Sequence, residues 1–336
     1  MKFLLFRCLA ALPTLFAVVC LGFMMTRLLP GDPATLYASQ PGMTEAEIGA
    51  LRTELALDKP LPAQFGAYVV GLAGGDLGYS RAMGRPVAEE IARRLPASLE
   101  LALCALLIAL SLGCAVGISG ALRPASRIDR MGSLLSATCL SVPTFVTALF
   151  LSHVLYDKLG WLPEPVGRLD PFLPYPEKIT GFLIIDSLAA GDGRALASSI
   201  AHLVLPAMTM AIFALGPIAR ITRTAMAEAV SADYFRAGRA RGLGAGRLIG
   251  SYALRNALLP ITTTAGLTFA YLFGANVVVE KMFAWPGLGS FAMDALIALD
   301  YAALQGFLLT VAAVLIAANL LVDLAHALID PRTAHR

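Results

Sequence analysis

Charged residues are scarce in this sequence, where they make up 15% of 336 residues against 57% that are hydrophobic. The mean hydropathy of +0.72 is well above that of an ordinary soluble domain. The composition therefore argues against a soluble globular protein and predicts a polytopic membrane protein.

Sequence motifs of catalysis and metal binding are also missing. There is no G-x-x-x-x-G-K-[ST] segment to hold nucleotide phosphates, no H-E-x-x-H or C-x-x-C pair, and no G-x-S-x-G turn. The five cysteines all lie in predicted spans, where their spacing predicts apolar packing rather than disulfides or metal ligands. We therefore assign no catalytic, cofactor-binding or metal-binding residue, expect no cofactor, and predict that the chain is not an enzyme.

What the sequence does contain is a set of long apolar segments. A helix needs ~20 mostly apolar residues to cross a bilayer, and six segments reach that length. They predict an all-α fold with six transmembrane helices. The approximate predicted spans are Leu4–Leu29, Ser98–Ala121, Met131–Tyr156, His202–Ile221, Leu259–Val279 and Gln305–Leu328.

The first apolar segment raises the question of a cleavable signal peptide, because Lys2 and Arg7 give it a basic start. Its apolar run continues to Met25, which is longer than a signal core of about 7–15 residues. No convincing small-x-small cleavage site precedes Pro30. We therefore expect the segment to remain as a membrane anchor.

Basic residues are distributed unevenly between the two sides of this topology. With the N-terminus inside, the inner segments carry fourteen of the 26 basic residues but only five of the 23 acidic residues. Lysine and arginine are enriched in cytoplasmic loops. We therefore predict that both termini are cytoplasmic.

The longest basic segment outside the spans runs from Met226 to Pro260. Seven arginines occur between Arg220 and Arg255, and only two acidic residues oppose them. Alanine and arginine favour helix on both sides of Gly242, whereas the glycines around it disfavour helix, so the segment predicts helix, glycine turn, helix. Charge alone leaves two roles open: a partner-binding loop, or a loop that only sets topology and touches lipid headgroups.

The pattern inside this loop resembles the cytoplasmic loop of binding-protein-dependent ABC importer permeases, whose signature is E-A-A-x3-G-x9-I-x-L-P. With Gly242 on the signature glycine, Ala237 matches the first alanine and Leu254 the leucine. Arg236 and Arg255 stand where the signature has glutamate and proline. The runs F-R-A-G-R-A-R-G-L and A-L-R-N-A-L-L-P look like the variant of the dipeptide, oligopeptide and nickel branch.

Other segments resemble the same branch, namely L-D-K-P-L-P and G-D-L-G-Y-S within residues 57–80, E-x-x-F-x-W-P-G-L-G at 280–289, and the ending D-P-R. The resemblance implies a type I ABC importer permease architecture with an external segment after the first span. Residues 1–96 would form the N-terminal span and this external segment, and 97–330 the transmembrane domain with its cytoplasmic coupling loop, 222–258. The external segment could cap the outer mouth of the path or only pack against the bundle.

The resemblance also implies a function, that of the transmembrane permease subunit of an ATP-driven importer of peptide-type or nickel-chelate solutes. Its partners would be a homologous permease in a heterodimer, two cytoplasmic ATPase subunits, and a periplasmic or extracytoplasmic substrate-binding protein. The protein would be a multi-pass component of the bacterial plasma (inner) membrane, in contact with the lipid bilayer and not with nucleic acid. The sequence identifies neither the solute nor the residues of the substrate path.

The alternative function is a stand-alone secondary carrier driven by an ion gradient. Such a carrier predicts acidic residues at the middle of the membrane and inverted repeats, and we find neither in the sequence. An integral-membrane enzyme is a third class, but no cluster of reactive residues supports it.

The coupling loop is the candidate site. The resemblance implies a short helix across the cytoplasmic face that docks on an ATPase subunit, with small residues for close approach, apolar anchors, and arginines at the rim. We expect Gly242 to reverse the chain through a positive φ. The predicted coupling residues are Tyr234, Phe235, Arg236, Ala237, Gly238, Arg239, Ala240, Arg241, Gly242 and Leu243.

Three local features complete the prediction. Pro143 predicts a bend in the third span, and residues 86–96 a short helix that ends before the second span. Trp285 is expected at the membrane interface.

A polar stripe in the last span concerns Asn319, Asp323 and His326, which share one helical face. A proton relay is one interpretation. Because the stripe lies near the end of the span, we expect interhelical hydrogen bonding or solvent contact instead.

Overall fold

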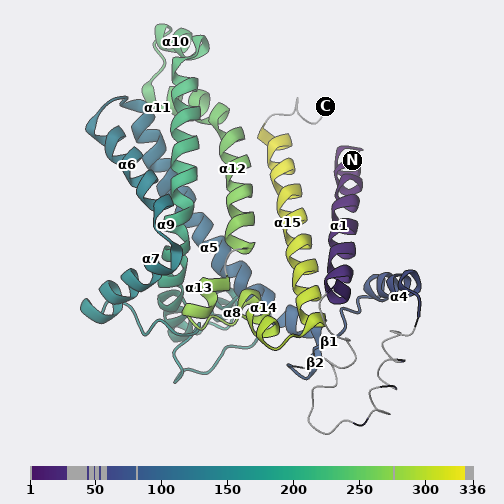
Figure 1. The fold of residues 1–336 in the computed structure, drawn as a ribbon. Coiled ribbons are helices and arrows are strands. Elements are labelled where there is room, and N and C mark those ends of the chain that lie inside the picture. The colour runs from purple at the N-terminus through teal and green to yellow at the C-terminus, as the bar shows by residue number, and fades with distance from the viewer. Residues whose placement is uncertain are drawn as a thin grey trace. The chain divides into compact units, whose positions relative to one another are not determined.

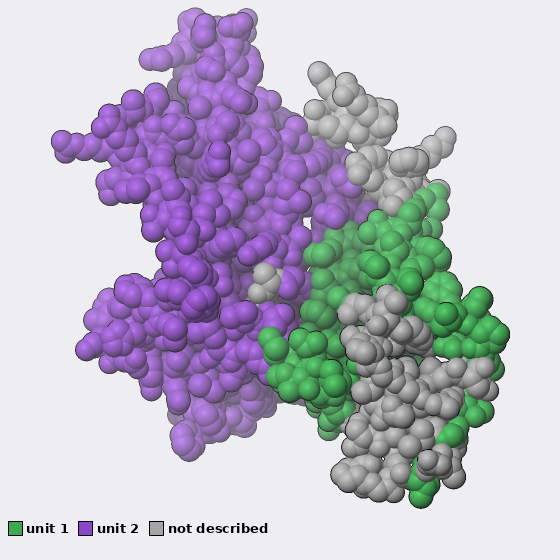
Figure 2. Space-filling view, viewed as in Figure 1, with its two compact units in different colours: residues 1–95, 291–316 green, residues 96–290, 317–336 purple. Residues whose placement is uncertain are grey.

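The computed structural model describes residues 2–28, 44, 49, 53, 59–80, 82–274 and 277–329. Within these residues helices dominate, and a short antiparallel hairpin pairs β1 (Tyr79–Ser80) with β2 (Arg85–Pro86) (Figure 1). The chain forms two compact units, residues 1–95 with 291–316 and residues 96–290 with 317–336 (Figure 2). The D-P-R ending lies outside the described residues.

The first unit contains α1, α4, the hairpin and parts of three further helices. Phe23 of α1 lies 5.2 Å from the ring of Phe65 in α4, in an edge-to-face arrangement. Asp300 accepts a hydrogen bond of 2.7 Å from the hydroxyl of Ser80, which ties the hairpin to the start of α15. The helices that contribute to this unit are α1 (Lys2–Leu28), α4 (Leu61–Ala73), α5 (Val87–Leu122), α14 (Leu288–Ile297) and α15 (Tyr301–Ile329).

The second unit is built around α9, which packs against both α6 and α12. The close approach of these helices depends on glycine. A Cβ on Gly117 of α5 would lie 2.6 Å from the Cβ of Thr222 in α9, and one on Gly216 of α9 would lie 2.8 Å from Leu140 in α6. The helices that lie wholly within this unit are α6 (Arg127–Ser141), α7 (Thr144–Leu151), η1 (Ser152–Lys158), α8 (Leu183–Ala189), α9 (Gly193–Ser231), α10 (Asp233–Ala240), α11 (Ala245–Arg247), η2 (Leu248–Leu254), α12 (Arg255–Gly274) and α13 (Val277–Met282).

The prediction of a polytopic helical membrane protein is confirmed. Among the described residues, four helical stretches are long and apolar enough to cross a membrane, or five if the bent pair of α6 with α7 and η1 counts as one span. In α1 the apolar helix found among the described residues is Leu12–Met24, which is shorter than a full span. The four stretches are Val87–Leu122, Gly193–Ser231, Ala245–Gly274 and Tyr301–Ile329.

The predicted short helix over residues 86–96 is wrong, because α5 continues without interruption through Pro96 to Leu122. A proline inside a helix costs about 3 kcal/mol through a lost hydrogen bond and a steric clash. Tertiary contacts hold the turn that follows it: Ala97 is 1% exposed, and its carbonyl accepts a hydrogen bond of 3.0 Å from the indole of Trp285.

The predicted bend at Pro143 is confirmed but is larger than a kink. The helix ends at Ser141 and restarts at Thr144, and the two parts differ in direction by 105°. Val142 is extended, with φ −91° and ψ 124°. The proline ring disfavours a helical conformation of the residue before it, which explains why the helix stops here rather than bending.

Candidate functional site

The predicted coupling loop follows α9, the longest helix among the described residues. At 1.5 Å per residue, its 39 residues extend about 58 Å, whereas a bilayer with its headgroups is about 40–45 Å thick. At least one end of α9 must therefore project beyond the membrane. Figure 1 shows α10 at the end of α9, where the chain turns back through α11 and η2 into α12.

The structure confirms the predicted succession of helix, glycine turn and helix. Gly242 has φ +74°, the left-handed conformation expected of it. The N–H of Gly242 donates to the carbonyl of Arg239 at 3.0 Å, and the N–H of Leu243 to that of Gly238 at 3.2 Å. These two bonds form a Schellman motif, which satisfies carbonyls at the end of α10 and reverses the chain.

One face of α10 packs against the rest of the second unit. Phe235 is 9% exposed and belongs to an apolar cluster with Met226 of α9 and Leu248 of η2. Gly238 is also buried, and a Cβ there would lie 2.7 Å from Cδ2 of Leu248. Leu243 is partly buried against the same cluster.

This placement changes the assignment of three predicted residues. Phe235 and Gly238 are buried and Leu243 is half-buried against the same cluster, so these three residues hold α10 on the bundle. The signal that reveals their role is the spacing of Phe235 and Gly238, since residues three apart share one face of a helix.

The opposite face of α10 is exposed. It presents the ring of Tyr234, which is 40% exposed, beside the small side chains of Ala237 and Ala240. Arg236 lies 3.8 Å from Asp233, but both side chains are so exposed that the pair contributes little stability. The remaining arginines of this face are Arg239 and Arg241, both exposed.

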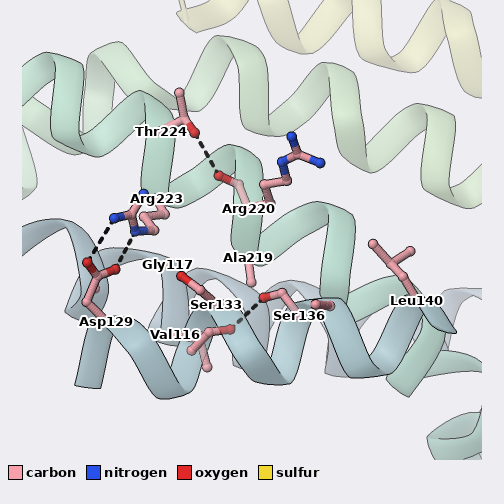
Figure 3. Close-up of a pocket in the computed structure, with 13 residues that line it drawn as sticks. Val116, Gly117, Asp129, Ser133, Ser136, Leu140, Ala219, Arg220, Arg223 and Thr224 are labelled. Carbon is pink, nitrogen blue, oxygen red and sulfur yellow. Dashed lines mark hydrogen bonds and ion pairs between the residues drawn. The ribbon is translucent and has the colours of Figure 1, made fainter. Parts of the chain in front are cut away.

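A pocket of about 550 Å³ lies beside α9 near the same end, between α5, α6 and α9 (Figure 3). At one edge the guanidinium of Arg223 binds the carboxylate of Asp129 in a bidentate ion pair. The N–H of Ala125 donates a third hydrogen bond to this carboxylate at 3.0 Å. This pair could not be predicted from the sequence, because nothing in the spacing of two residues 94 positions apart shows that they meet.

The segment E-x-x-F-x-W-P-G-L-G folds around a buried carboxylate. Glu280 is 0% exposed and accepts hydrogen bonds from the hydroxyl of Ser98 at 2.5 Å and from the N–H of Ser290 at 2.9 Å. The hydroxyl of Ser98 in turn accepts the N–H of Leu288 at 2.8 Å. A Cβ on Gly287 would collide with the carboxylate of Glu280, which explains the glycine of the motif.

The expected interfacial position of Trp285 is wrong. Trp285 is 1% exposed, and its indole N–H is satisfied by the carbonyl of Ala97. The guanidinium of Arg168 lies over its ring at 5.5 Å from the centroid, a cation–π contact. Trp285 is therefore part of the packed interior, because both its apolar ring and its one donor find partners there.

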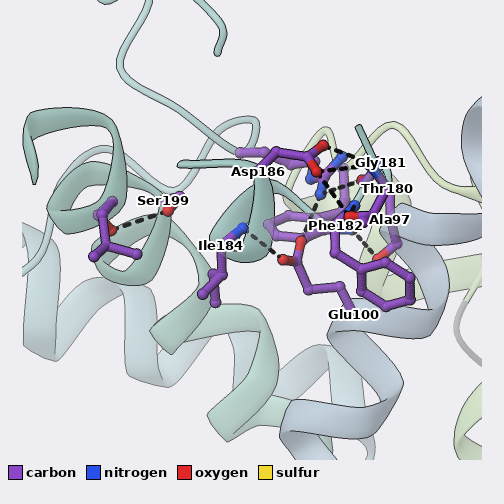
Figure 4. Close-up of polar contacts among 11 residues, drawn as sticks. Ala97, Glu100, Thr180, Gly181, Phe182, Ile184, Asp186 and Ser199 are labelled. Atoms are coloured by element: carbon purple, nitrogen blue, oxygen red, sulfur yellow. Dashed lines mark hydrogen bonds and ion pairs between the residues drawn. The ribbon is translucent and has the colours of Figure 1, made fainter. Parts of the chain in front are cut away.

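Glu100 lies in a buried polar network (Figure 4), to which Arg168 also belongs. Arg168 donates to the carboxylate of Glu100 at 2.5 Å and to the carbonyl of Gly181 at 3.2 Å. The other oxygen of Glu100 accepts the N–H of Ile184 at 2.9 Å, at the start of α8. The network therefore fixes the loop before α8 against α5.

Asp186 of α8 closes the same loop (Figure 4). Its carboxylate accepts the N–H of Thr180 at 2.8 Å, the hydroxyl of Thr180 at 2.7 Å and the N–H of Gly181 at 2.9 Å. Burial by itself raises the pKa of Asp186, but these hydrogen bonds together outweigh it and hold the pKa below its usual value.

The polar stripe of the last span makes an interhelical contact. Nε2 of His326 in α15 lies 3.2 Å from the hydroxyl of Thr263 in α12. The expectation of interhelical hydrogen bonding is therefore confirmed for His326.

Comparison with known proteins places these features in context. Residues 105–335 match the family model described as binding-protein-dependent transport system inner membrane component, and residues 1–102 match the model of its N-terminal part. The chain is 40% identical to a probable D,D-dipeptide transport system permease protein of Escherichia coli (strain K12), over 97% of this chain and 95% of that protein.

Two further relatives match over nearly their whole length. The chain is 37% identical to a dipeptide transport system permease protein of the same E. coli strain, over 100% of this chain and 99% of the relative. It is 36% identical to a glutathione transport system permease protein of Pectobacterium atrosepticum, over 98% of both chains.

Proposed function

The chain belongs to the family of binding-protein-dependent transport system inner membrane components, and from this membership we propose how it serves its transporter. It is the membrane permease component of an ABC importer for peptide-type solutes, and it is not itself an enzyme. The alternative of a stand-alone carrier finds no support in these relatives.

We take small peptides and peptide-like molecules as the solutes, rather than nickel chelates. The named relatives are permeases of D,D-dipeptide, dipeptide and glutathione transport systems. All three solutes are short chains of amide-linked residues. This shared chemistry supports a peptide-type solute for the present chain.

In this proposal α10 transmits to the permease the conformational change that accompanies ATP hydrolysis on a separate ATPase subunit. The observation that carries it is the division of α10 into two faces. Phe235 and Gly238 fasten one face to α9 and η2, so a force on α10 reaches both helices directly. The other face offers an aromatic ring, two alanines and exposed arginines, which suit a groove with an acidic rim.

The same proposal sets the remaining architecture. Six spans, with α1 as the first and the bent pair as the third, place both termini and α10 in the cytoplasm. A homologous permease forms the second half of the path, two ATPase subunits bind the cytoplasmic face, and a substrate-binding protein docks outside. Residues 1–96 form the N-terminal span with its external segment, and 97–330 form the transmembrane domain.

Coupling is tested on the exposed face of α10. In the intact transporter, Ala237→Glu should insert normally but lose association with the ATPase subunits and lose uptake of a labelled dipeptide, because it places a like charge against an acidic rim. Ala245→Glu in α11, also exposed, is the matched control and should transport normally. Full uptake by the Ala237→Glu variant would show that α10 helps to set the topology but does not couple the permease to the ATPase.

The turn after α10 supplies a second test. At Gly242 a side chain would meet no atom within 4 Å, so substitution acts only through the backbone. Gly242→Val should cost about 1–2 kcal/mol in the left-handed conformation and weaken coupling. Gly242→Asn should transport nearly normally, because asparagine tolerates this conformation.

Orientation is tested by single cysteines in a cysteine-free background. A cysteine in place of Ala240 should be protected from an impermeant thiol reagent in intact cells, whereas one in place of Pro60 should react. Both positions are exposed, so accessibility of the side chain is not limiting. Reaction at position 240 without permeabilisation would contradict the proposed topology.

A further inference from the structure

The pocket between α5, α6 and α9 is not needed by the coupling mechanism, yet it has a definite chemistry. The ion pair of Asp129 with Arg223 forms its charged edge, and Arg220 lies one turn of α9 away from this pair, toward Leu140 (Figure 3). Its opposite edge is apolar and ends at Ala137 and Leu140. From Asp129 to Leu140 the pocket extends about 16 Å along α6, at 1.5 Å per residue.

This gradient of polarity follows the depth expected in a membrane. Asp129 lies in the first turn of α6, near the end of the helix, and Leu140 lies three turns deeper. The headgroup layer and the upper part of the hydrocarbon core cover a comparable distance. The pocket is therefore polar at headgroup depth and apolar at the depth of acyl chains.

The net charge of the residues that line the pocket favours an anion. The carboxylate of Asp129 is already satisfied by Arg223 and by the N–H of Ala125. Arg220 lines the pocket and is exposed, and its guanidinium makes no hydrogen bond or ion pair with the described residues. The hydroxyl of Ser133 lines the same space as an additional donor, whereas that of Thr224 donates to the carbonyl of Arg220 at 3.1 Å.

The walls of the pocket are packed tightly enough to keep it open. A Cβ on Gly117 would lie 2.7 Å from the carbonyl oxygen of Ala219, and one on Gly132 would lie 2.9 Å from Val116. The helices are thus already at their closest approach and cannot slide together to fill the space. On the neighbouring surface of α6, Met131 is 70% exposed.

We propose that this pocket binds an anionic phospholipid, whose phosphate pairs with Arg220 while its glycerol and first acyl carbons lie against Ala137 and Leu140. A volume of about 550 Å³ is within the usual range for a small-molecule site. The neighbouring basic segment, with exposed Arg123, Arg127 and Arg130, adds attraction for anionic headgroups. In the proposed orientation, this lipid belongs to the cytoplasmic leaflet of the bilayer.

The test uses the full-length chain, purified in detergent with the subunits that accompany it, and native mass spectrometry. Phosphatidylglycerol and phosphatidylethanolamine with identical acyl chains are added in separate samples. The wild type should retain phosphatidylglycerol in preference to phosphatidylethanolamine. Arg220→Gln should reduce that retention at least tenfold, because a charge-assisted hydrogen bond is lost. Arg220→Lys should keep most of it.

Two further variants separate the site from general effects of charge and folding. Arg194→Gln removes an exposed arginine at the other end of α9 and should not change lipid retention. Ser133→Trp fills the pocket without altering its charge and should reduce retention while the thermal unfolding midpoint stays near that of the wild type.

Three results would overturn the proposal. Equal retention of both lipids by the wild type would show that the pocket does not select an anion. Displacement of phosphatidylglycerol by inorganic phosphate would identify a free-phosphate site. Crosslinking from position 133 to a second permease in lipid-free detergent would show that protein fills the pocket. Lipid retention is measured without transport. A failure of the coupling tests would therefore not affect this proposal.

Discussion

The guanidinium of Arg223 and the carboxylate of Asp129 form a bidentate ion pair across 94 residues of sequence. The pair joins the first turn of α6 to the last turns of α9, just before the chain enters α10. Asp129 is 5% exposed, so its charge depends on this partner more than a surface charge would. Any displacement of α9 at this end must therefore be shared by α6 or break the pair.

We predict that Arg223→Gln will lower the thermal unfolding midpoint and reduce uptake, because it leaves a buried carboxylate without its counter-charge. Arg85→Gln is the matched control, since its pair with Glu89 is exposed and should contribute almost nothing. The double variant Asp129→Asn with Arg223→Gln should lose less stability than the two single variants would lose together. Strict additivity in this cycle would mean that the two residues do not depend on each other.

Gly117→Ala should destabilise the contact between α5 and α9. The new methyl group would lie 2.7 Å from a backbone carbonyl, which cannot move aside as a side chain can. We expect a loss of about 1–3 kcal/mol in the free energy of unfolding. Gly250→Ala in η2 meets no atom within 4 Å and should be neutral or slightly stabilising. Equal stability of the two variants would show that the contact between α5 and α9 can accommodate an added methyl group.

Ser98→Ala should destabilise the fold around Glu280. The hydroxyl of Ser98 donates to Glu280 and accepts from Leu288, so its removal leaves the buried N–H of Leu288 without an acceptor. The expected loss is about 1–3 kcal/mol, measured as a lower thermal unfolding midpoint. Ser111→Ala is the control, because that hydroxyl is exposed and bonds only within its own helix. A Ser98 variant as stable as this control would contradict the assigned role.

The pKa of Asp186 predicts a loss of stability in acid. The folded protein holds this pKa below the unfolded value of about 4. The ionised carboxylate therefore stabilises the fold above that pH, and the contribution disappears as the pH falls through the folded pKa. Unfolding midpoints between pH 6 and pH 3 should fall more steeply for the wild type than for Asp186→Asn. Parallel curves would assign the acid sensitivity to other groups.

Several features of this protein were determined by the sequence alone. Long apolar runs predicted the membrane helices, because lipid requires such runs whatever their neighbours. The local chemistry of Gly242 predicted the reversal after α10, and the spacing of its neighbours identified the family. Pro143 predicted a break, since a proline restricts its own turn and the preceding residue in any context.

Other features depended on contacts between distant segments. Tryptophan is typical of membrane interfaces, but Trp285 lies in the protein interior, where the carbonyl of Ala97 and the guanidinium of Arg168 contact it. Pro96 reads as a helix end, yet tertiary packing continues the helix through it. Phe235 reads as an outward anchor, and only the position of Leu248 shows that it points inward. In each case the local sequence does not decide the outcome, and partners far along the chain do.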